Sequence, residues 1–295
     1  MKEILVIGAG TMGNGIAHCF AQHKFKVSLV DVQPKSLELA KEKISNNLER
    51  MVKKNLISVE EKINTLKNIS FHTNLEDCAP NSDLVIEAAT ELKTIKLAIF
   101  KKLDTLCKPN TILASNTSSI SIQEIAEVTK RQEKVIGMHF MNPVPVMKLV
   151  EVIKTHHTSK ATIRTIIDLS IELNKKPVIV NDSPGFVANR ILLPMINEAI
   201  LTLEEGVSGV QEIDQVMILG MSHPMGPLQL ADFIGLDVCL SILEILHDGF
   251  KNKKYQPSKL LQQLVKNGEL GVKSKIGFYD YTMGIKDKKV AKRFL

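Results

Sequence analysis

The chain has 295 residues and a formal net charge of +6, and 44% of its residues are hydrophobic and 24% are charged. This composition excludes a disordered protein and is typical of a globular one. The length favours two domains over a single domain. The N-terminal apolar run at residues 4–7 is too short for a secretory signal, and no run approaches the ~18 apolar residues of a membrane helix. Since the four cysteines are scattered without a CxxC pair, we expect reduced thiols in a cytoplasmic protein with no membrane partner.

The first part of the chain alternates short apolar runs with amphipathic stretches. The predicted strands cover residues 4–7, 27–30, 84–86, 112–114, 135–138, 148–153 and 177–180. Helices are predicted at residues 16–22, 92–106 and 159–173. Apolar strands separated by helices are typical of a parallel sheet with helices on both faces, so we expect a doubly wound α/β domain over residues 1–184.

The pattern changes at residues 181–185, Asn-Asp-Ser-Pro-Gly, which are turn formers. No clear strand follows. The predicted helices cover residues 186–205, 210–219, 227–246 and 258–266. We therefore place a domain boundary near residue 184 and expect an all-helical C-terminal domain over residues 185–295.

A glycine motif, Gly8-Ala9-Gly10-Thr11-Met12-Gly13, lies between the first predicted strand and the first predicted helix. In a GxGxxG turn the first glycine permits the tight turn, the second lets the backbone approach a pyrophosphate, and the third allows close helix–strand packing. Asp31 ends the next strand, where its carboxylate can accept hydrogen bonds from the adenosine ribose. This context favours a Rossmann-type dinucleotide site over a glycine-rich turn with a surface aspartate. No arginine adjoins Asp31, so NAD is favoured, and Lys35 leaves NADP open.

Polar side chains follow two further strands. Glu87 and Glu91 end one of them, and residues 115–119, Ser-Asn-Thr-Ser-Ser, follow the next. In a parallel sheet these ends face the ligand crevice, so both groups are candidates for contact with cofactor or substrate. Exposed loop carboxylates and ordinary turn chemistry explain them equally well.

A histidine and a glutamate stand in two otherwise apolar strands within residues 137–152. If Asn-Pro-Val-Pro at 142–145 reverses the chain, a hairpin centred on Pro145 puts His139 opposite Glu151 on one face. A buried carboxylate is costly unless it is paired, and an imidazole partner would be held in one tautomer for proton transfer. The alternative is a histidine at the core edge and an unrelated, solvent-facing glutamate.

Other features argue against metals and nucleic acids. No HExxH and no Cys/His spacing of a metal site is present, and the basic residues are not interleaved with aromatic ones. The densest basic stretch, residues 41–54, also holds glutamates. It is interpreted either as a solvated helix face or as a site for a polyanionic small molecule.

Taken together, these segments closely resemble the 3-hydroxyacyl-coenzyme A dehydrogenases, in particular the short bacterial 3-hydroxybutyryl-coenzyme A dehydrogenases. The resemblance covers essentially the whole chain. It is carried by GAGTMGNGIA (8–17), DLVIEAATE (83–91), ILASNTSSISI (112–122), IGMHFMNPVPVMKLVEVI (136–153), SPGFVANRIL (183–192), HPMGPLQLADFIGLD (223–237) and GFYDY (277–281).

The resemblance implies roles for particular residues. His139 would be the catalytic acid/base paired with Glu151, Ser118 would bond the 3-oxygen of the substrate, and Asn189 would help to hold the acyl thioester. Arg50 and Lys54 would lie near a coenzyme A phosphate. Residues implied on the cofactor side are Gly8, Gly10, Met12, Gly13, Asp31, Glu91, Lys96, Asn116 and Asn142.

The resemblance also implies a reaction and an assembly. We expect reversible reduction of a 3-ketoacyl-coenzyme A to the (S)-3-hydroxyacyl form by NADH, with acetoacetyl-coenzyme A as the substrate, in a homodimer joined through the helical domain. Two alternatives stay open. One is a non-catalytic dinucleotide-binding relative, and the other is a dehydrogenase of free 3-hydroxy acids, which would lack a basic coenzyme A surface.

Overall fold

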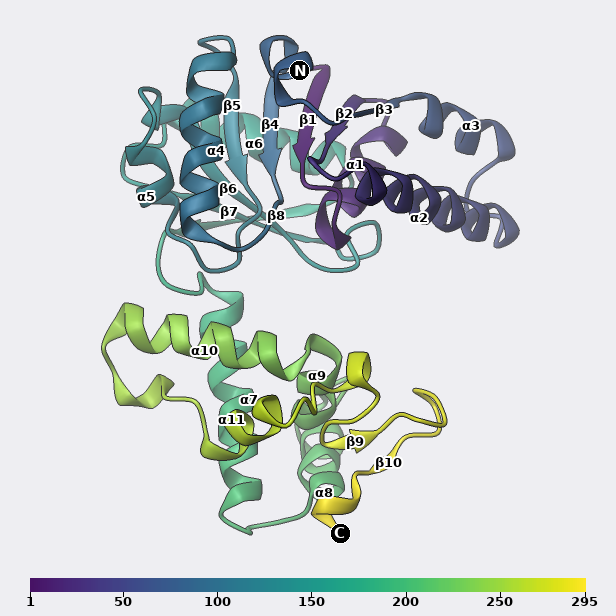
Figure 1. Ribbon diagram of the computed structural model, residues 1–295, viewed down its shortest axis with the longest axis vertical. Coiled ribbons are helices and arrows are strands. Elements are labelled where there is room, and N and C mark those ends of the chain that lie inside the picture. The colour runs from purple at the N-terminus through teal and green to yellow at the C-terminus, as the bar shows by residue number, and fades with distance from the viewer. The chain divides into compact units, whose positions relative to one another are not determined.

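The computed structural model describes residues 1–295, which fold into two compact units, Met1–Ser183 and Pro184–Leu295 (Figure 1). The first unit is built on an eight-stranded sheet in the order β3-β2-β1-β4-β5-β6-β7-β8. Its strands are β1 (Glu3–Ile7), β2 (Lys26–Val30), β3 (Ile69–His72), β4 (Leu84–Glu87), β5 (Ile112–Ser115), β6 (Val135–Phe140), β7 (Leu149–Lys154) and β8 (Lys176–Asn181). Neighbouring strands are parallel except β6 and β7, which form an antiparallel hairpin.

The doubly wound α/β architecture predicted from the sequence is confirmed. The helices of this unit are α1 (Thr11–Gln22), α2 (Pro34–Lys53), α3 (Val59–Lys67), α4 (Lys93–Leu106), α5 (Ile122–Glu127) and α6 (Lys160–Glu172). Because successive side chains of a strand point to opposite faces, Ile4 and Val6 share one face, and they join one apolar core with Ile16 of α1 and Ile166 of α6. Helix α4 lies on the other side of the sheet from α6 (Figure 1).

The second unit is helical, as predicted, but it differs in detail. Its helices are α7 (Ala188–Glu204), α8 (Val210–Gln215), α9 (Pro227–Ile234), α10 (Leu236–Phe250) and α11 (Lys259–Lys266). The single helix predicted over residues 227–246 is wrong, because Gly235 takes a φ of 102° and separates α9 from α10. Helix α8 passes into a π-helical turn, Val216–Gly220. Near the C-terminus, β9 (Tyr279–Asp280) and β10 (Lys289–Val290) form a short antiparallel ribbon.

A buried carboxylate ties the C-terminal segment to α9. Asp232 accepts hydrogen bonds from the backbone N–H of Phe278 (3.0 Å) and Tyr279 (2.9 Å) and from the hydroxyl of Tyr281 (3.1 Å). Burial raises the pKa of Asp232 to about 7, although these three donors act in the opposite direction.

No helix in either unit combines the length and the hydrophobicity that are needed to cross a bilayer.

Candidate active site

The glycine turn between β1 and α1 has the shape that a dinucleotide requires. Gly8 has a φ of 96°, and a Cβ on it would lie 2.6 Å from the carbonyl oxygen of Ala88. A Cβ on Gly13 would overlap the carbonyl oxygen of Gly8. Gly10, by contrast, faces open space, with no atom within 4 Å of a Cβ position. Packing therefore permits only glycine at positions 8 and 13, whereas Gly10 leaves room for a ligand at the start of α1.

Asp31 stands at the end of β2 and is fixed to this turn. Its carboxylate accepts hydrogen bonds from the backbone N–H of Ala9 (2.8 Å) and Gln33 (2.9 Å). It lines a cavity of about 890 Å³ together with Gly8, Gly10 and Met12. The same cavity is bordered by Val32 and, from α4, by Ile95 and Ile99. Apolar walls around a fixed carboxylate suit an adenosine group, so the residues present fit a dinucleotide.

A buried ion pair lies behind the ends of β4 and β5. Glu87 is 0% exposed, and both of its oxygens accept hydrogen bonds from the ammonium of Lys96, at 2.7 and 2.9 Å. The hydroxyl of Ser115 and the N–H of Ala89 donate to the same carboxylate. Lys96 is itself buried and also pairs with Glu91 at 3.2 Å. Neither Glu87 nor Lys96 lines the Asp31 cavity, and Lys96 contacts the loop residue Glu91.

Glu91 holds the loop that follows β5. Its Oε1 accepts hydrogen bonds from the hydroxyl of Thr117 (2.5 Å), the N–H of Ser118 (2.9 Å) and the hydroxyl of Ser119 (2.9 Å). Burial acts to raise the pKa of Glu91, but the ammonium of Lys96 and these donors outweigh it, and the pKa lies below its usual value. Glu91 is therefore ionised near neutral pH and fixes three consecutive loop residues.

His139 and Glu151 face each other in the β6–β7 hairpin. The two residues are directly paired in the register, as the sequence predicts, and Nδ1 of His139 lies 2.8 Å from Oε2 of Glu151. Both side chains are buried. An ionised Glu151 carboxylate can only accept a hydrogen bond, which requires the ring proton of His139 on Nδ1. The other nitrogen, Nε2, lies 3.2 Å from the hydroxyl of Ser118.

Two asparagines and one residue of the second unit complete the predicted set. Asn116 follows β5, and its Oδ1 accepts a hydrogen bond from the N–H of Phe140 (2.8 Å), which leaves its amide N–H₂ to donate. Asn142 lines a different cavity from that of Asp31. Asn189 belongs to the first turn of α7 in the second unit.

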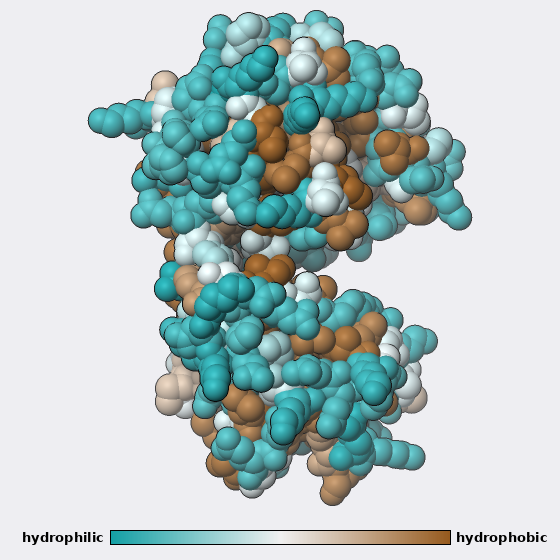
Figure 2. Space-filling view, turned by 60° about the vertical axis from the view of Figure 1, so that its left-hand side comes forward, coloured by the Kyte–Doolittle hydropathy of each residue, from teal (hydrophilic) through white to brown (hydrophobic).

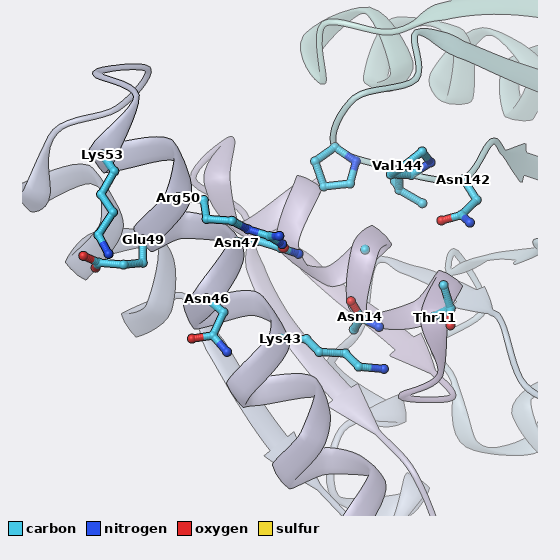
Figure 3. Close-up of a pocket in the computed structure, with 13 residues that line it drawn as sticks. Thr11, Asn14, Lys43, Asn46, Asn47, Glu49, Arg50, Lys53, Asn142 and Val144 are labelled. Atoms are coloured by element: carbon cyan, nitrogen blue, oxygen red, sulfur yellow. The ribbon is translucent and has the colours of Figure 1, made fainter. Parts of the chain in front are cut away.

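The second cavity, of about 630 Å³, lies between α1, α2 and the loop after β6 (Figure 3). Lys43, Arg50 and Lys53 of α2 line it, and so does Glu49, whose carboxylate is paired with Lys62. Figure 3 shows Lys43 and Arg50 reaching from α2 towards α1. The lining is therefore cationic. Of the two basic residues predicted here, Arg50 lines the cavity, whereas Lys54 is an exposed residue at the end of α2 and Lys53 lies in its place.

Sequence reasoning missed the buried partners of this site. Ser115 and Thr117 were contained in a polar run, but nothing in that run indicated which residue would bind which carboxylate. Three-residue groups of His, Cys, Asp or Glu placed to hold a metal ion are absent from the structure.

Comparison with known proteins gives a consistent result. Residues 3–183 match the family model of the 3-hydroxyacyl-CoA dehydrogenase NAD binding domain, and residues 185–281 match that of the 3-hydroxyacyl-CoA dehydrogenase C-terminal domain. The probable 3-hydroxybutyryl-CoA dehydrogenase of Bacillus subtilis is 53% identical over 281 residues, which is 95% of this chain and 98% of that protein. The mitochondrial hydroxyacyl-coenzyme A dehydrogenase of Homo sapiens is 42% identical over 287 residues, covering 95% and 91% of the two chains.

Solved structures agree. The crystal structure of (S)-3-hydroxybutyryl-CoA dehydrogenase from Ralstonia eutropha superposes with a TM-score of 0.92 at 45% identity, covering 96% of this chain and 99% of that one.

Proposed function

Because the chain belongs to the 3-hydroxyacyl-CoA dehydrogenase family, we propose that it interconverts 3-hydroxybutyryl-CoA and acetoacetyl-CoA with NAD(H). The observation that carries this proposal is the row of hydrogen bonds from Ser118 through His139 to Glu151, in the same unit as the dinucleotide turn. Such a row suits a proton transfer that accompanies reduction of a carbonyl.

In the direction of reduction, the hydride for C3 of the ketone is supplied by the bound nicotinamide. His139, protonated at both nitrogens, donates its Nε2 proton to the oxygen as negative charge develops there. Ser118 donates a second hydrogen bond to that oxygen. Glu151 keeps Nδ1 protonated and stabilises the imidazolium, so oxidation uses the same groups in reverse. We assign Asn116, through its free amide N–H₂, to the nicotinamide side and Asn189 to the acyl thioester.

We propose that the cationic cavity at α2 receives the phosphates of coenzyme A. Lys43, Arg50 and Lys53 supply three positive charges, and the one carboxylate among them is already paired. Phosphate groups are the anions that such clusters of lysine and arginine bind best. A free 3-hydroxy acid would leave this cavity without a role, which favours the thioester as the substrate.

We propose NAD rather than NADP as the cofactor. The carboxylate of Asp31 is held in place by Ala9 and Gln33, so it cannot swing away from a 2′-phosphate. Neither Val32 nor Gln33 offers a cation to offset the repulsion. The single positive charge of Lys35 is not enough to reverse the preference for NAD that this fixed carboxylate sets.

We also propose a homodimer joined through the helical unit, in the cytoplasm. Apolar side chains are exposed on this unit (Figure 2), including Val216, Leu219 and Met221 around the π-helical turn, and Leu219 is 80% exposed. Contiguous exposed apolar residues are typical of interaction surfaces. All four cysteines are free and buried, as expected in a reducing compartment.

The first experiment follows nicotinamide absorbance as the protein meets NADH and acetoacetyl-CoA, with NADPH and with free acetoacetate in parallel. We expect rapid oxidation with NADH and the thioester only. Turnover of free acetoacetate at a similar rate would contradict the role of the basic cavity. Binding of NADH without turnover in any arm would identify a non-catalytic relative and overturn the proposed reaction.

A further inference from the structure

Lys175 is a buried cation that lines neither the Asp31 cavity nor the cationic cavity at α2. It stands in the turn between α6 and β8 and is only 6% exposed. Its ammonium has no carboxylate partner and donates instead to two main-chain carbonyl oxygens, of Val144 (2.5 Å) and Met147 (2.8 Å). Burial lowers the pKa of this ammonium, because a buried charge is unfavourable unless hydrogen bonds compensate for the lost hydration.

The loop that Lys175 binds, residues 142–147, cannot satisfy these carbonyls itself. Pro143 and Pro145 have no N–H to donate. The N–H groups of Val146 and Met147 both donate to the carbonyl of Pro143, at 3.0 Å each. The carbonyl oxygens of Val144 and Met147 therefore depend on a donor from elsewhere in the fold, and Lys175 supplies it to both.

On its other side, the same loop rests on helix α1. A Cβ on Gly15 would lie 3.1 Å from both Cβ and Cγ2 of Val144, closer than a normal contact, and Val144 is buried. The loop is thus held between Gly15 of α1 on one side and the ammonium of Lys175, which binds two of its carbonyl oxygens, on the other.

This loop forms one wall of the cationic cavity. Asn142, Pro143, Val144 and Pro145 line the cavity on the side facing α2 (Figure 3). Lys175 does not line it and cannot touch a ligand there directly. Any effect of Lys175 on ligand binding must therefore act through the position of the loop.

We propose that Lys175 is a positioning residue that fixes the 142–147 loop as a wall of the cavity and so sets the affinity for the nucleotide part of an acyl-CoA. This inference rests on the proposed function. It predicts an effect on the binding of the complete thioester and none on a thioester that lacks the nucleotide, because a truncated substrate does not reach this wall.

The test is Lys175→Met, which keeps the length of the side chain and removes the donor. We expect the KM for acetoacetyl-CoA to rise about tenfold, equivalent to ~1.4 kcal/mol of lost binding, with kcat within about a factor of two. The KM for NADH and the kcat/KM for acetoacetyl-N-acetylcysteamine should stay within about a factor of two. Lys176→Met is the matched control, since Lys176 is the next residue, is exposed and does not bind the loop.

Either of two kinetic results would overturn the proposal: unchanged kinetics in a folded Lys175→Met protein, or an equal loss with the complete and the truncated thioester. Hydrogen exchange of the peptide spanning 142–147 provides a readout independent of activity, and we expect faster exchange there in the variant than in Lys176→Met. Should Lys175→Met not fold, Lys175→Gln takes its place. Its shorter side chain keeps one amide donor group, so we expect a smaller rise in KM in the same direction, again confined to the complete thioester. A wild-type protein that fails to turn over acetoacetyl-CoA refutes the proposed function, whereas unchanged exchange refutes the role of Lys175.

Discussion

Replacement of Glu151 by glutamine tests the proposed chemistry most directly. The substitution preserves the shape of the side chain and removes only its charge. Its carboxylate is buried and lies 2.8 Å from Nδ1 of His139. In oxidation of the hydroxyacyl thioester, His139 gains a proton and a positive charge, so the variant must form that charge with no negative partner.

The size of the loss follows from the geometry. Two unit charges about 4 Å apart attract each other by roughly 4 kcal/mol at the effective dielectric constant of ~20 that suits protein sites. Each 1.36 kcal/mol of barrier corresponds to about a factor of ten in rate, so kcat for oxidation should fall about a thousandfold. Glutamine can also donate its amide N–H to Nδ1, which would leave Nε2 protonated and unable to accept the substrate proton.

The assay is NADH formation from (S)-3-hydroxybutyryl-CoA and NAD, with NADH affinity measured separately by fluorescence titration. We expect the affinity to change by less than about twofold. Glu172→Gln, at an exposed position at the end of α6, is the charge-matched control and should retain full activity. A Glu151→Gln enzyme that keeps more than a tenth of the normal kcat would refute the idea that the carboxylate stabilises the imidazolium.

Three further predictions concern the cofactor turn and the second unit. Gly13→Ala should abolish NADH binding, measured by titration, because the added Cβ would overlap the carbonyl oxygen of Gly8; retained binding would contradict that overlap. Asp31→Ser should weaken NADH binding about tenfold and raise the ratio of kcat/KM for NADPH to that for NADH, and an unchanged ratio would exclude Asp31 as the selective group. In Asp232 the folded pKa of about 7 lies above the usual 3.8, so the native state holds its proton more tightly and this group's contribution to stability is lost as pH rises from about 4 to about 7. Thermal melting of Asp232→Asn between pH 5 and 8 should therefore show a flatter decline than the wild type, and an equally steep decline would rule out Asp232 as the titrating group.

Local patterns predicted the parts of the site that depend on neighbouring residues. The glycine turn could be predicted because its steric demands lie within a few residues of Gly8. The His139–Glu151 pair could be predicted because a hairpin is symmetric about its turn, so the midpoint at Pro145 fixes which residues face each other. In both cases, short-range geometry decides the outcome.

Contacts between distant segments could not be predicted in this way. Lys175 lies 31 residues from Val144, and its surrounding sequence gives no sign that its ammonium would be buried on another loop. Strand β3 escaped prediction because only Ile69 of its four residues is buried, so no apolar run marks it. The break at Gly235 was missed because a glycine within a helical pattern is tolerated at a penalty of only ~1 kcal/mol, and its positive φ is set by packing.

The one antiparallel step in the sheet has a consequence for how this site can vary. Two neighbouring parallel strands must be joined by a crossover of a dozen or more residues, whereas an antiparallel pair needs only a short connection. Here β7 runs back along β6, so the distance between His139 and Glu151 is set by backbone pairing in the ladder and not by the connecting loop. The 142–147 loop can therefore change to accommodate different ligands while the acid/base pair keeps its spacing. Ligand recognition by the loop and proton transfer by the His139–Glu151 pair thus depend on different parts of the same hairpin.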